Sequence, residues 1–132
     1  MKYALIGCGR IATNHVKAVL NNGLEFVAAC DVEEANIETL LAKHNLENDK
    51  SIARYQNYKK MIEEHPELEL VAIATSSGAH AEIALYCIDH NINVIIEKPM
   101  AMNMADADEI IKRSEAKGVK VCACHQNRFN IA

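Results

Sequence analysis

The chain has 132 residues, of which 50% are hydrophobic and 24% are charged, and its formal net charge is -4. This length suggests one domain, and the composition is that of an ordinary globular protein. No segment gathers enough lysine and arginine to bind nucleic acid, and no apolar run reaches the roughly 18 residues that a membrane-spanning helix needs. We therefore expect a cytoplasmic protein whose partners are neither nucleic acids nor membranes.

The cysteines are odd in number and form no C-x-x-C pair. We expect them to be small buried hydrophobic groups in a reducing compartment, with no metal site, and a metal or redox role is the alternative. They are Cys8, Cys30, Cys87, Cys122 and Cys124.

Short apolar runs alternate with longer helical patterns along the chain. The apolar runs predict strands at 3–6, 26–30, 71–74, 94–96 and 119–123, and the helical patterns lie at about 10–21, 33–44, 56–64, 79–90 and 104–117. The first four runs are almost continuously hydrophobic, which is typical of strands covered on both faces. The alternation predicts an α/β protein with a doubly wound parallel sheet, whose ligands bind at the carboxyl ends of the strands.

A glycine-rich sequence follows the first predicted strand. Residues 7–12 read G-C-G-R-I-A, which fits the pattern G-x-G-x-x-A, and they open a helical pattern. In this motif Gly7 would permit a tight turn, Gly9 would let the backbone approach a pyrophosphate, and Ala12 would keep helix and strand close. The helix N-terminus would offer N–H groups to the phosphates. On the motif alone, a glycine-rich turn without a ligand stays open as an alternative.

An acidic residue ends the second predicted strand. Asp31 stands about two dozen residues after Gly7, close to where an acidic residue meets the adenosine ribose in dinucleotide-binding domains. A carboxylate there accepts hydrogen bonds from the ribose hydroxyls and repels a 2′-phosphate, and residues 32–34 supply no cation. The sequence therefore predicts a Rossmann-type domain that binds NAD rather than NADP. A role for Asp31 as the N-cap of the next helix is compatible with this interpretation.

Small hydroxyl residues follow the third predicted strand. Thr75, Ser76 and Ser77 are placed to line the ribose and nicotinamide side of the cofactor, or to cap the helix that begins near residue 79, and one loop can do both. His80 falls in the first turn of that helix, where a structural role is favoured over a ligand contact.

The fourth predicted strand ends in Glu97-Lys98-Pro99. A lysine at the carboxyl end of a parallel strand, followed by a proline that fixes the turn, points its ammonium group into the ligand crevice. There Lys98 would hydrogen-bond a substrate hydroxyl and favour alkoxide character as a hydride leaves. The alternative is a surface lysine paired with Glu97.

These motifs together resemble the Gfo/Idh/MocA (glucose–fructose oxidoreductase/inositol dehydrogenase-like) family over the whole chain. The resemblance rests on residues 7–12, Asp31, A-T-S-S-G-A-H at 74–80, E-K-P-M-A at 97–101 and N-R-F-N at 127–130. It implies an NAD-dependent dehydrogenase in which Lys98 is the active-site lysine, Pro99 shapes the site beside the nicotinamide, and Arg128 lies near cofactor or substrate. The expected cofactor-binding residues are Gly7, Gly9, Arg10, Ile11, Asp31, Thr75, Ser76, His80, Glu97, Lys98, Pro99 and Arg128.

The run at 124–130, C-H-Q-N-R-F-N, is most similar to family members that oxidise UDP-sugars. Those include the UDP-N-acetyl-2-amino-2-deoxyglucuronate 3-dehydrogenases of surface-polysaccharide synthesis. The resemblance thus implies hydride transfer from a secondary hydroxyl of a sugar or nucleotide-sugar to NAD. For His125 a solvent-exposed position is favoured over a catalytic role.

The resemblance also implies a second domain. Family members continue into an α/β domain that carries the acid–base residue, most of the sugar-binding surface and the interface of a homo-oligomer. We expect residues 1–121 to be an isolated N-terminal NAD-binding domain and 122–132 to begin the crossover to an absent C-terminal domain. The chain alone would then bind NAD weakly and turn over no sugar. The alternatives are a stand-alone, non-catalytic NAD-sensing module and a methyltransferase fold that binds S-adenosylmethionine, against which Glu97-Lys98-Pro99 and Ala12 count.

Overall fold

The structure, a computed structural model, describes residues 1–75, 77–97 and 101–124. In this part of the chain, six parallel strands form one sheet in the order β3-β2-β1-β4-β5-β6. The elements in chain order are β1 (Lys2–Ile6), α1 (Ala12–Asn21), β2 (Glu25–Cys30), α2 (Glu34–Lys43), β3 (Ala53–Tyr55), α3 (Tyr58–Glu64), β4 (Leu70–Ile73), a 3₁₀ turn η1 (Ser77–Ala79), α4 (His80–Asp89), β5 (Asn93–Glu97), α5 (Met104–Lys117) and β6 (Val121–Cys124).

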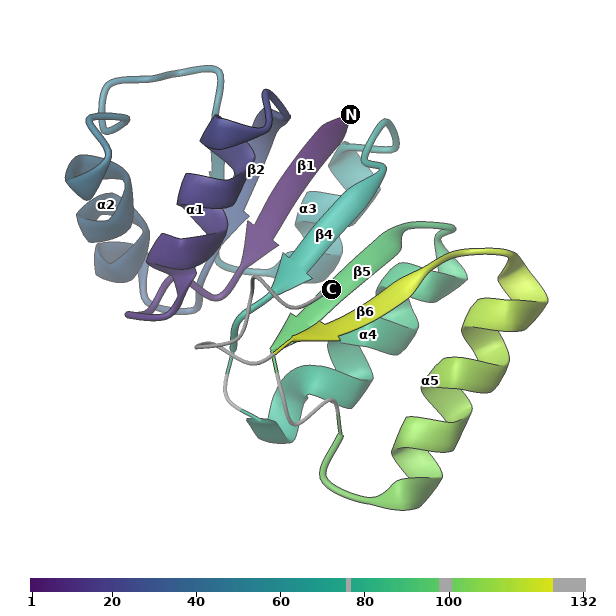
Figure 1. The fold of residues 1–132 in the computed structure, drawn as a ribbon. Helices are drawn as coiled ribbons and strands as arrows, with labels where there is room; N and C mark the ends of the chain where they lie inside the picture. The colour runs from purple at the N-terminus through teal and green to yellow at the C-terminus, as the bar shows by residue number, and fades with distance from the viewer. Residues whose placement is uncertain (76, 98–100, 125–132) are drawn as a thin grey trace.

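The helices cover both faces of the sheet (Figure 1). Helices α1 and α2 pack on one face, and α3, α4 and α5 pack on the other. Alternate residues of β1 enter the two cores: Leu5 joins the cluster with α1 and α2, whereas Ile6 joins the cluster with α3, α4 and α5. This two-sided burial explains why the central strands are almost continuously hydrophobic after their first residues. The predicted doubly wound parallel sheet is confirmed.

Strands β2 and β3 follow one another on one side of β1, whereas β4, β5 and β6 follow one another on its other side. Strand β1 pairs in parallel with β2 on one side and β4 on the other, and Ile6 lies beside both Cys30 and Ile73. The carboxyl ends of these three strands therefore meet at one level, which is the switch point where doubly wound sheets bind ligands. None of the helices that the structure describes is long and apolar enough to cross a membrane.

The observed elements differ from the sequence predictions at several positions. The edge strand β3 was not predicted, and the last strand is Val121–Cys124 rather than 119–123. Helix α5 begins and ends where predicted, because the Asn103 side chain accepts a hydrogen bond of 2.8 Å from the Asp106 N–H and Gly118 ends the helix in the left-handed conformation.

Candidate functional site

A cavity of about 710 Å³ opens at the carboxyl ends of β1, β2 and β4. Its volume lies in the range of small-molecule binding sites. The first turns of α3 and α4 close its far side through residues that include Tyr58 and Glu82, whose hydroxyl and carboxylate are joined by a hydrogen bond of 2.8 Å. The predicted residues that line the cavity are Gly7, Gly9, Asp31 and Thr75.

Gly7 makes the first turn of the glycine-rich loop and packs against the end of β4. Its φ angle is 97°, and a Cβ atom at this position would lie only 2.5 Å from the carbonyl carbon of Ala74. Its N–H donates a hydrogen bond of 2.8 Å to the Cys30 carbonyl on β2. Position 7 therefore needs glycine for two reasons, the positive φ angle of the turn and the close approach of the chain at the end of β4. The sequence predicted the turn but not the close approach.

The backbone of Gly9, Arg10 and Ile11 leads into α1. A Cβ atom on Gly9 would meet nothing within 4 Å, so the space beside this residue is open. Arg10 is exposed, and Ile11 is the N-cap residue of the helix. Ala12 is fully buried between helix and sheet, as the motif predicted. The N–H groups of Ala12, Thr13 and Asn14 donate to the carbonyls of residues 9–11. The loop backbone at residues 9–11, at the N-terminus of α1, therefore lies beside the open space, which fits the pyrophosphate of a dinucleotide.

Asp31 is held in place by the backbone of two loops. Its Oδ2 accepts a hydrogen bond of 2.8 Å from the Cys8 N–H, and its Oδ1 accepts one of 2.8 Å from the Glu33 N–H. The Asn36 side chain lies farther from Oδ1, at 3.4 Å. Each carboxylate oxygen can accept about two hydrogen bonds, so among the described contacts Oδ2 retains an acceptor position for a ribose hydroxyl. The N-cap residue of α2 is Glu33, so the N-cap role considered for Asp31 is wrong.

Two buried cysteines lie close together at the glycine-rich loop, Cys8 within it and Cys30 at the end of β2. Burial raises the pKa of both Cys8 and Cys30 to about 12, and the neighbouring Asp31 carboxylate adds to the shift. Both thiols are therefore protonated at neutral pH and act as small apolar groups. Cys87 is buried as well, which agrees with the sequence prediction, whereas the Cys122 side chain is exposed and departs from it.

His80 fixes the loop that follows β4. The ring is 1% exposed, and its Nε2 donates a hydrogen bond of 2.9 Å to the carbonyl of Thr75. This contact shapes the loop at the edge of the cavity, which is the structural role favoured from the sequence. The 3₁₀ turn η1 (Ser77–Ala79) runs directly into α4, whose own N-cap residue is Ala79, so whether a hydroxyl residue caps the start of this helical segment stays a prediction. Ser76 lies outside the described residues.

Glu97 ends β5 and is buried, with 6% of its surface exposed. Its Oε2 lies 2.5 Å from Nε2 of His15, a residue of α1 that the sequence analysis did not single out. A signal was present, because Ala12, His15, Val16 and Val19 form the buried stripe of α1, and a histidine on such a stripe needs a polar partner. The predicted residues Lys98, Pro99 and Arg128, together with His125, lie outside the described residues.

The described residues contain no group of three or more His, Cys, Asp and Glu side chains that is arranged to hold a metal ion. The cavity instead combines an open glycine backbone, a helix N-terminus and a fixed carboxylate. This donor set fits a dinucleotide whose pyrophosphate meets the helix and whose ribose meets the carboxylate.

Comparison with known proteins agrees with this geometry. The oxidoreductase family Gfo/Idh/MocA, described as having an NAD-binding Rossmann fold, matches residues 1–125. Inositol 2-dehydrogenase of Salmonella typhimurium is 29% identical over 123 residues, which make up 92% of this chain and 35% of that protein.

Solved structures give the same result. The WlbA dehydrogenase of Bordetella pertussis, crystallised with NADH and UDP-GlcNAcA, is 26% identical with a TM-score of 0.82 over 93% of this chain and 36% of that chain. The myo-inositol 2-dehydrogenase of Lactobacillus plantarum is 25% identical with a TM-score of 0.80 over 94% of this chain and 36% of that chain. The chain thus spans about a third of the length of the relatives that it matches. It belongs to the Gfo/Idh/MocA oxidoreductase family and is an NAD-binding Rossmann domain of that family.

Proposed function

We propose that this chain is the cofactor-binding part of an enzyme that oxidises a secondary hydroxyl of a sugar, with NAD as the hydride acceptor. The observation that carries the proposal is the Asp31 carboxylate, held by the Cys8 N–H at the rim of a cavity that Gly9 leaves open. Relatives that act on inositol, and a neighbour crystallised with a UDP-sugar, support a polyhydroxylated substrate. Within this class we favour a UDP-sugar, as the run at 124–130 suggested.

The residues of the cavity divide the work of holding the cofactor. The backbone of Gly9, Arg10 and Ile11 would meet the pyrophosphate, and Asp31 would accept the adenosine ribose hydroxyls and exclude a 2′-phosphate. Thr75 and Ser76 would lie on the nicotinamide side, and His80 holds this loop through its hydrogen bond to the Thr75 carbonyl. When bound, NAD supplies a nicotinamide that accepts hydride.

The chemistry on the substrate side falls to the residues that follow β5. Lys98 comes directly after Glu97, the last residue of that strand. Its ammonium group would donate a hydrogen bond to the substrate hydroxyl and stabilise negative charge on that oxygen as hydride departs. Pro99 and Arg128 would complete this side of the site. We propose that the base that takes the hydroxyl proton, most of the sugar-binding surface and a homo-oligomer interface belong to polypeptide that the longer relatives carry in addition.

A chimeric enzyme tests this proposal. Residues 1–124 would replace the matching segment of the Salmonella typhimurium relative, and NADH formation would be followed with myo-inositol and with UDP-sugars as substrates. We expect turnover by the chimera and none by the 132-residue chain alone. In the chimera, Lys98→Met should lower the rate by at least about a hundredfold, whereas Lys112→Met on the exposed face of α5 should not. A chimera that binds NADH but oxidises none of these substrates, or a Lys98→Met variant with an unchanged rate, would contradict the proposal.

A further inference from the structure

The pair formed by His15 and Glu97 is the most deeply buried ion-pairing contact that the structure describes. His15 is 8% exposed and Glu97 is 6% exposed, and their Nε2 and Oε2 atoms lie 2.5 Å apart. Removing a carboxylate from water is costly unless a partner compensates it, so such a pair needs a reason for its position. The two residues are 82 positions apart in sequence and come from different elements, α1 and β5.

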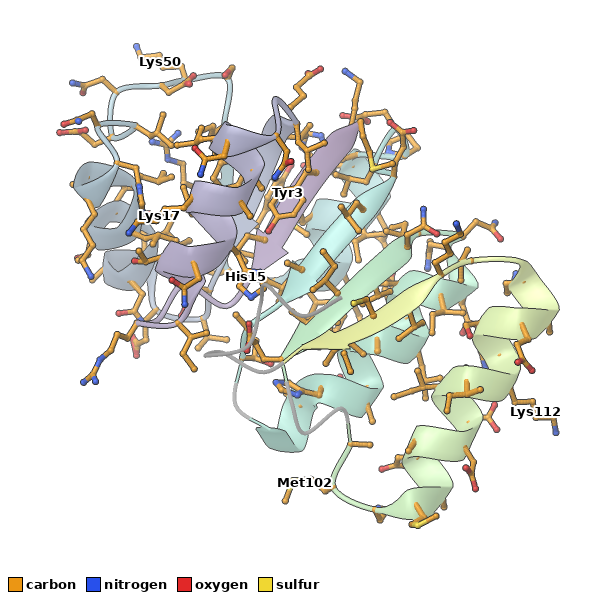
Figure 2. The ribbon with its side chains drawn as sticks, in the orientation of Figure 1. Tyr3, His15, Lys17, Lys50, Met102 and Lys112 are labelled. Atoms are coloured by element: carbon orange, nitrogen blue, oxygen red, sulfur yellow. The ribbon has the colours of Figure 1, made fainter. Side chains whose placement is uncertain are left out.

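The proposed cofactor site has a phosphate half, at the N-terminus of α1, and a nicotinamide half, beside the end of β5. The pair joins the elements that carry these two halves. Ile6, Ile73 and Ile96 lie side by side across β1, β4 and β5, so Glu97 stands at the same level as Gly7. His15 lies about one turn into α1, whose N-terminus faces the cavity, and it extends toward the carboxyl ends of the strands (Figure 2).

A third strand lies between the two elements that the pair joins. The strand that separates β1 from β5 is β4, and it is followed by Ala74, which packs with Ile95 against the core beneath α1. Alanine is the smallest side chain with a Cβ atom, and His15 and Glu97 are in contact although β4 separates β1 from β5. The contact therefore bridges the helix that receives the pyrophosphate and the strand end that leads into Lys98.

We propose that His15 and Glu97 are a positioning pair that fixes the nicotinamide half of the site relative to the phosphate half. The pair holds Glu97, the last residue of β5, against α1, and Lys98 is the next residue in the sequence. Neither residue acts on the substrate as an acid or a base in this role. This inference rests on the proposed function, because it assumes that the nicotinamide lies beside the end of β5.

A positioning role and a purely stabilising role of this pair predict different effects on ligand binding. If it positions the nicotinamide half, its loss should weaken binding of NADH and leave binding of ADP-ribose, which lacks the nicotinamide, unchanged. If it only stabilises the fold, both ligands should be affected alike or not at all. The ratio of the two dissociation constants therefore separates the roles.

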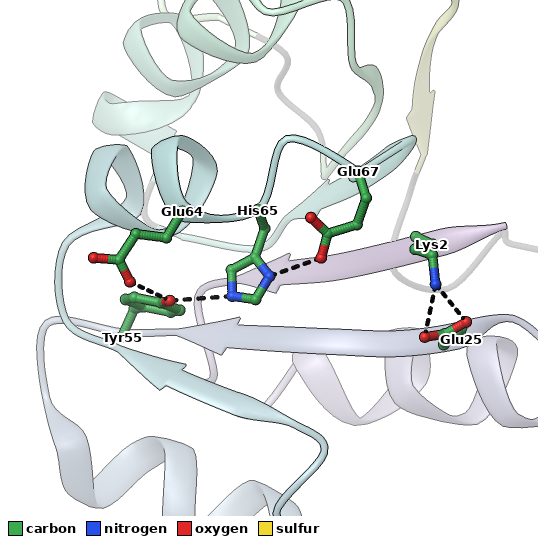
Figure 3. Close-up of polar contacts among 6 residues, drawn as sticks. All are labelled: Lys2, Glu25, Tyr55, Glu64, His65 and Glu67. Atoms are coloured by element: carbon green, nitrogen blue, oxygen red, sulfur yellow. Dashed lines mark hydrogen bonds and ion pairs between the residues drawn. The ribbon is translucent and has the colours of Figure 1, made fainter.

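The experiment uses calorimetric titration of the 132-residue chain with NADH and with ADP-ribose. The first variant is His15→Leu. The double variant His15→Leu/Glu97→Leu leaves no unpaired carboxylate in the interior and serves in case the single variant does not fold. The third variant, His15→Gln, keeps an N–H donor near the position of Nε2. His65→Leu is the matched control. It breaks a histidine–glutamate contact of 2.9 Å with Glu67 that lies at the end of α3 (Figure 3) and does not line the cavity.

We expect the leucine variants to raise the ratio of the NADH to the ADP-ribose dissociation constant by about tenfold. His15→Gln should restore much of the difference, the fluorescence enhancement of bound NADH should fall in parallel, and the His65 control should match the original chain. The inference would be overturned if the leucine variants lost affinity equally for both ligands. It would also be overturned if the original chain bound NADH no more tightly than ADP-ribose. Neither result would contradict the proposed binding of the cofactor. Binding of neither ligand by the folded original chain would instead overturn the proposed function.

Discussion

At the scale of single residues, the two loop glycines have different physical tasks. The backbone at Gly7 is left-handed and presses against Ala74, whereas Gly9 has open space where a side chain would be. The motif G-x-G-x-x-A predicted this division, with the turn at Gly7 and the ligand approach at Gly9, and the structure adds the close approach of Ala74 to Gly7. The structure assigns the first glycine to the fold and leaves the second to a ligand.

This difference predicts that the same substitution affects stability at Gly7 and cofactor binding at Gly9. Gly7→Ala should lower the free energy of unfolding by more than about 1 kcal/mol, because the new methyl group meets strained φ and the β4 backbone. Gly9→Ala should leave the melting temperature unchanged and weaken NADH binding, because its methyl group occupies the space that the pyrophosphate needs. Circular dichroism melts and calorimetric titrations measure the two effects. A stable Gly7→Ala variant, or a Gly9→Ala variant with unchanged affinity, would show that the assignment is wrong.

The candidate site was predictable from sequence where it depends on local pattern. Gly7, Gly9 and Asp31 sit at strand ends that continuous hydrophobic runs reveal, and the structure brings them to one cavity. The partnership of His15 with Glu97 was not predictable, because the two residues are 82 positions apart and meet only through the strand order β1-β4-β5.

At the scale of elements, prediction succeeded where burial leaves a pattern. Strands β1, β2 and β4 are buried on both faces and read as apolar runs. The edge strand β3 has three residues of intermediate burial, with Arg54 in the middle, and such a segment has no periodic signature. The Arg54 guanidinium bonds to the carbonyls of Glu47 and Asp49 in the preceding loop, so tertiary contacts rather than local pattern define this strand.

Helix α5 offers a test of how its start is fixed. Asn103 Oδ1 accepts a hydrogen bond of 2.8 Å from the Asp106 N–H at the first turn. Asn103→Ala should therefore lower the free energy of unfolding by about 1 kcal/mol, and Asn103→Ser, which keeps a capping oxygen, should cost less. Urea unfolding followed by circular dichroism measures both values. Equal losses for the two variants would mean that the cap does not carry the effect.

At the scale of the whole molecule, the buried thiols make stability depend on pH. Burial raises the pKa of Cys8, Cys30 and Cys87 from 9.0 to about 12. Above pH 9 the unfolded chain releases these protons and the folded chain retains them, so stability is fully present below that pH and is lost as pH rises toward about 12.

Each buried cysteine should contribute a slope of about 1.4 kcal/mol per pH unit in this window. Removing one of them by Cys87→Ala should make the decline shallower by about that amount, while Cys122→Ala, at an exposed position, should leave the slope unchanged. Urea unfolding across a series of alkaline pH values gives the slopes. Identical slopes for the original chain and Cys87→Ala would contradict the pKa shift.

The whole molecule is built around a cavity beside the glycine-rich loop, which we propose binds NAD and in which Asp31 selects NAD over NADP. The most direct measurement is the melting temperature of the chain as NADH and, in parallel, NADPH are added. A ligand present at about 100 times its dissociation constant adds roughly 2.7 kcal/mol of stability, which for a chain of this size is a rise of several degrees. We predict that rise with NADH and a much smaller one with NADPH. An equal rise with both cofactors would contradict the role of Asp31, and no rise with either would contradict the assignment of the cavity.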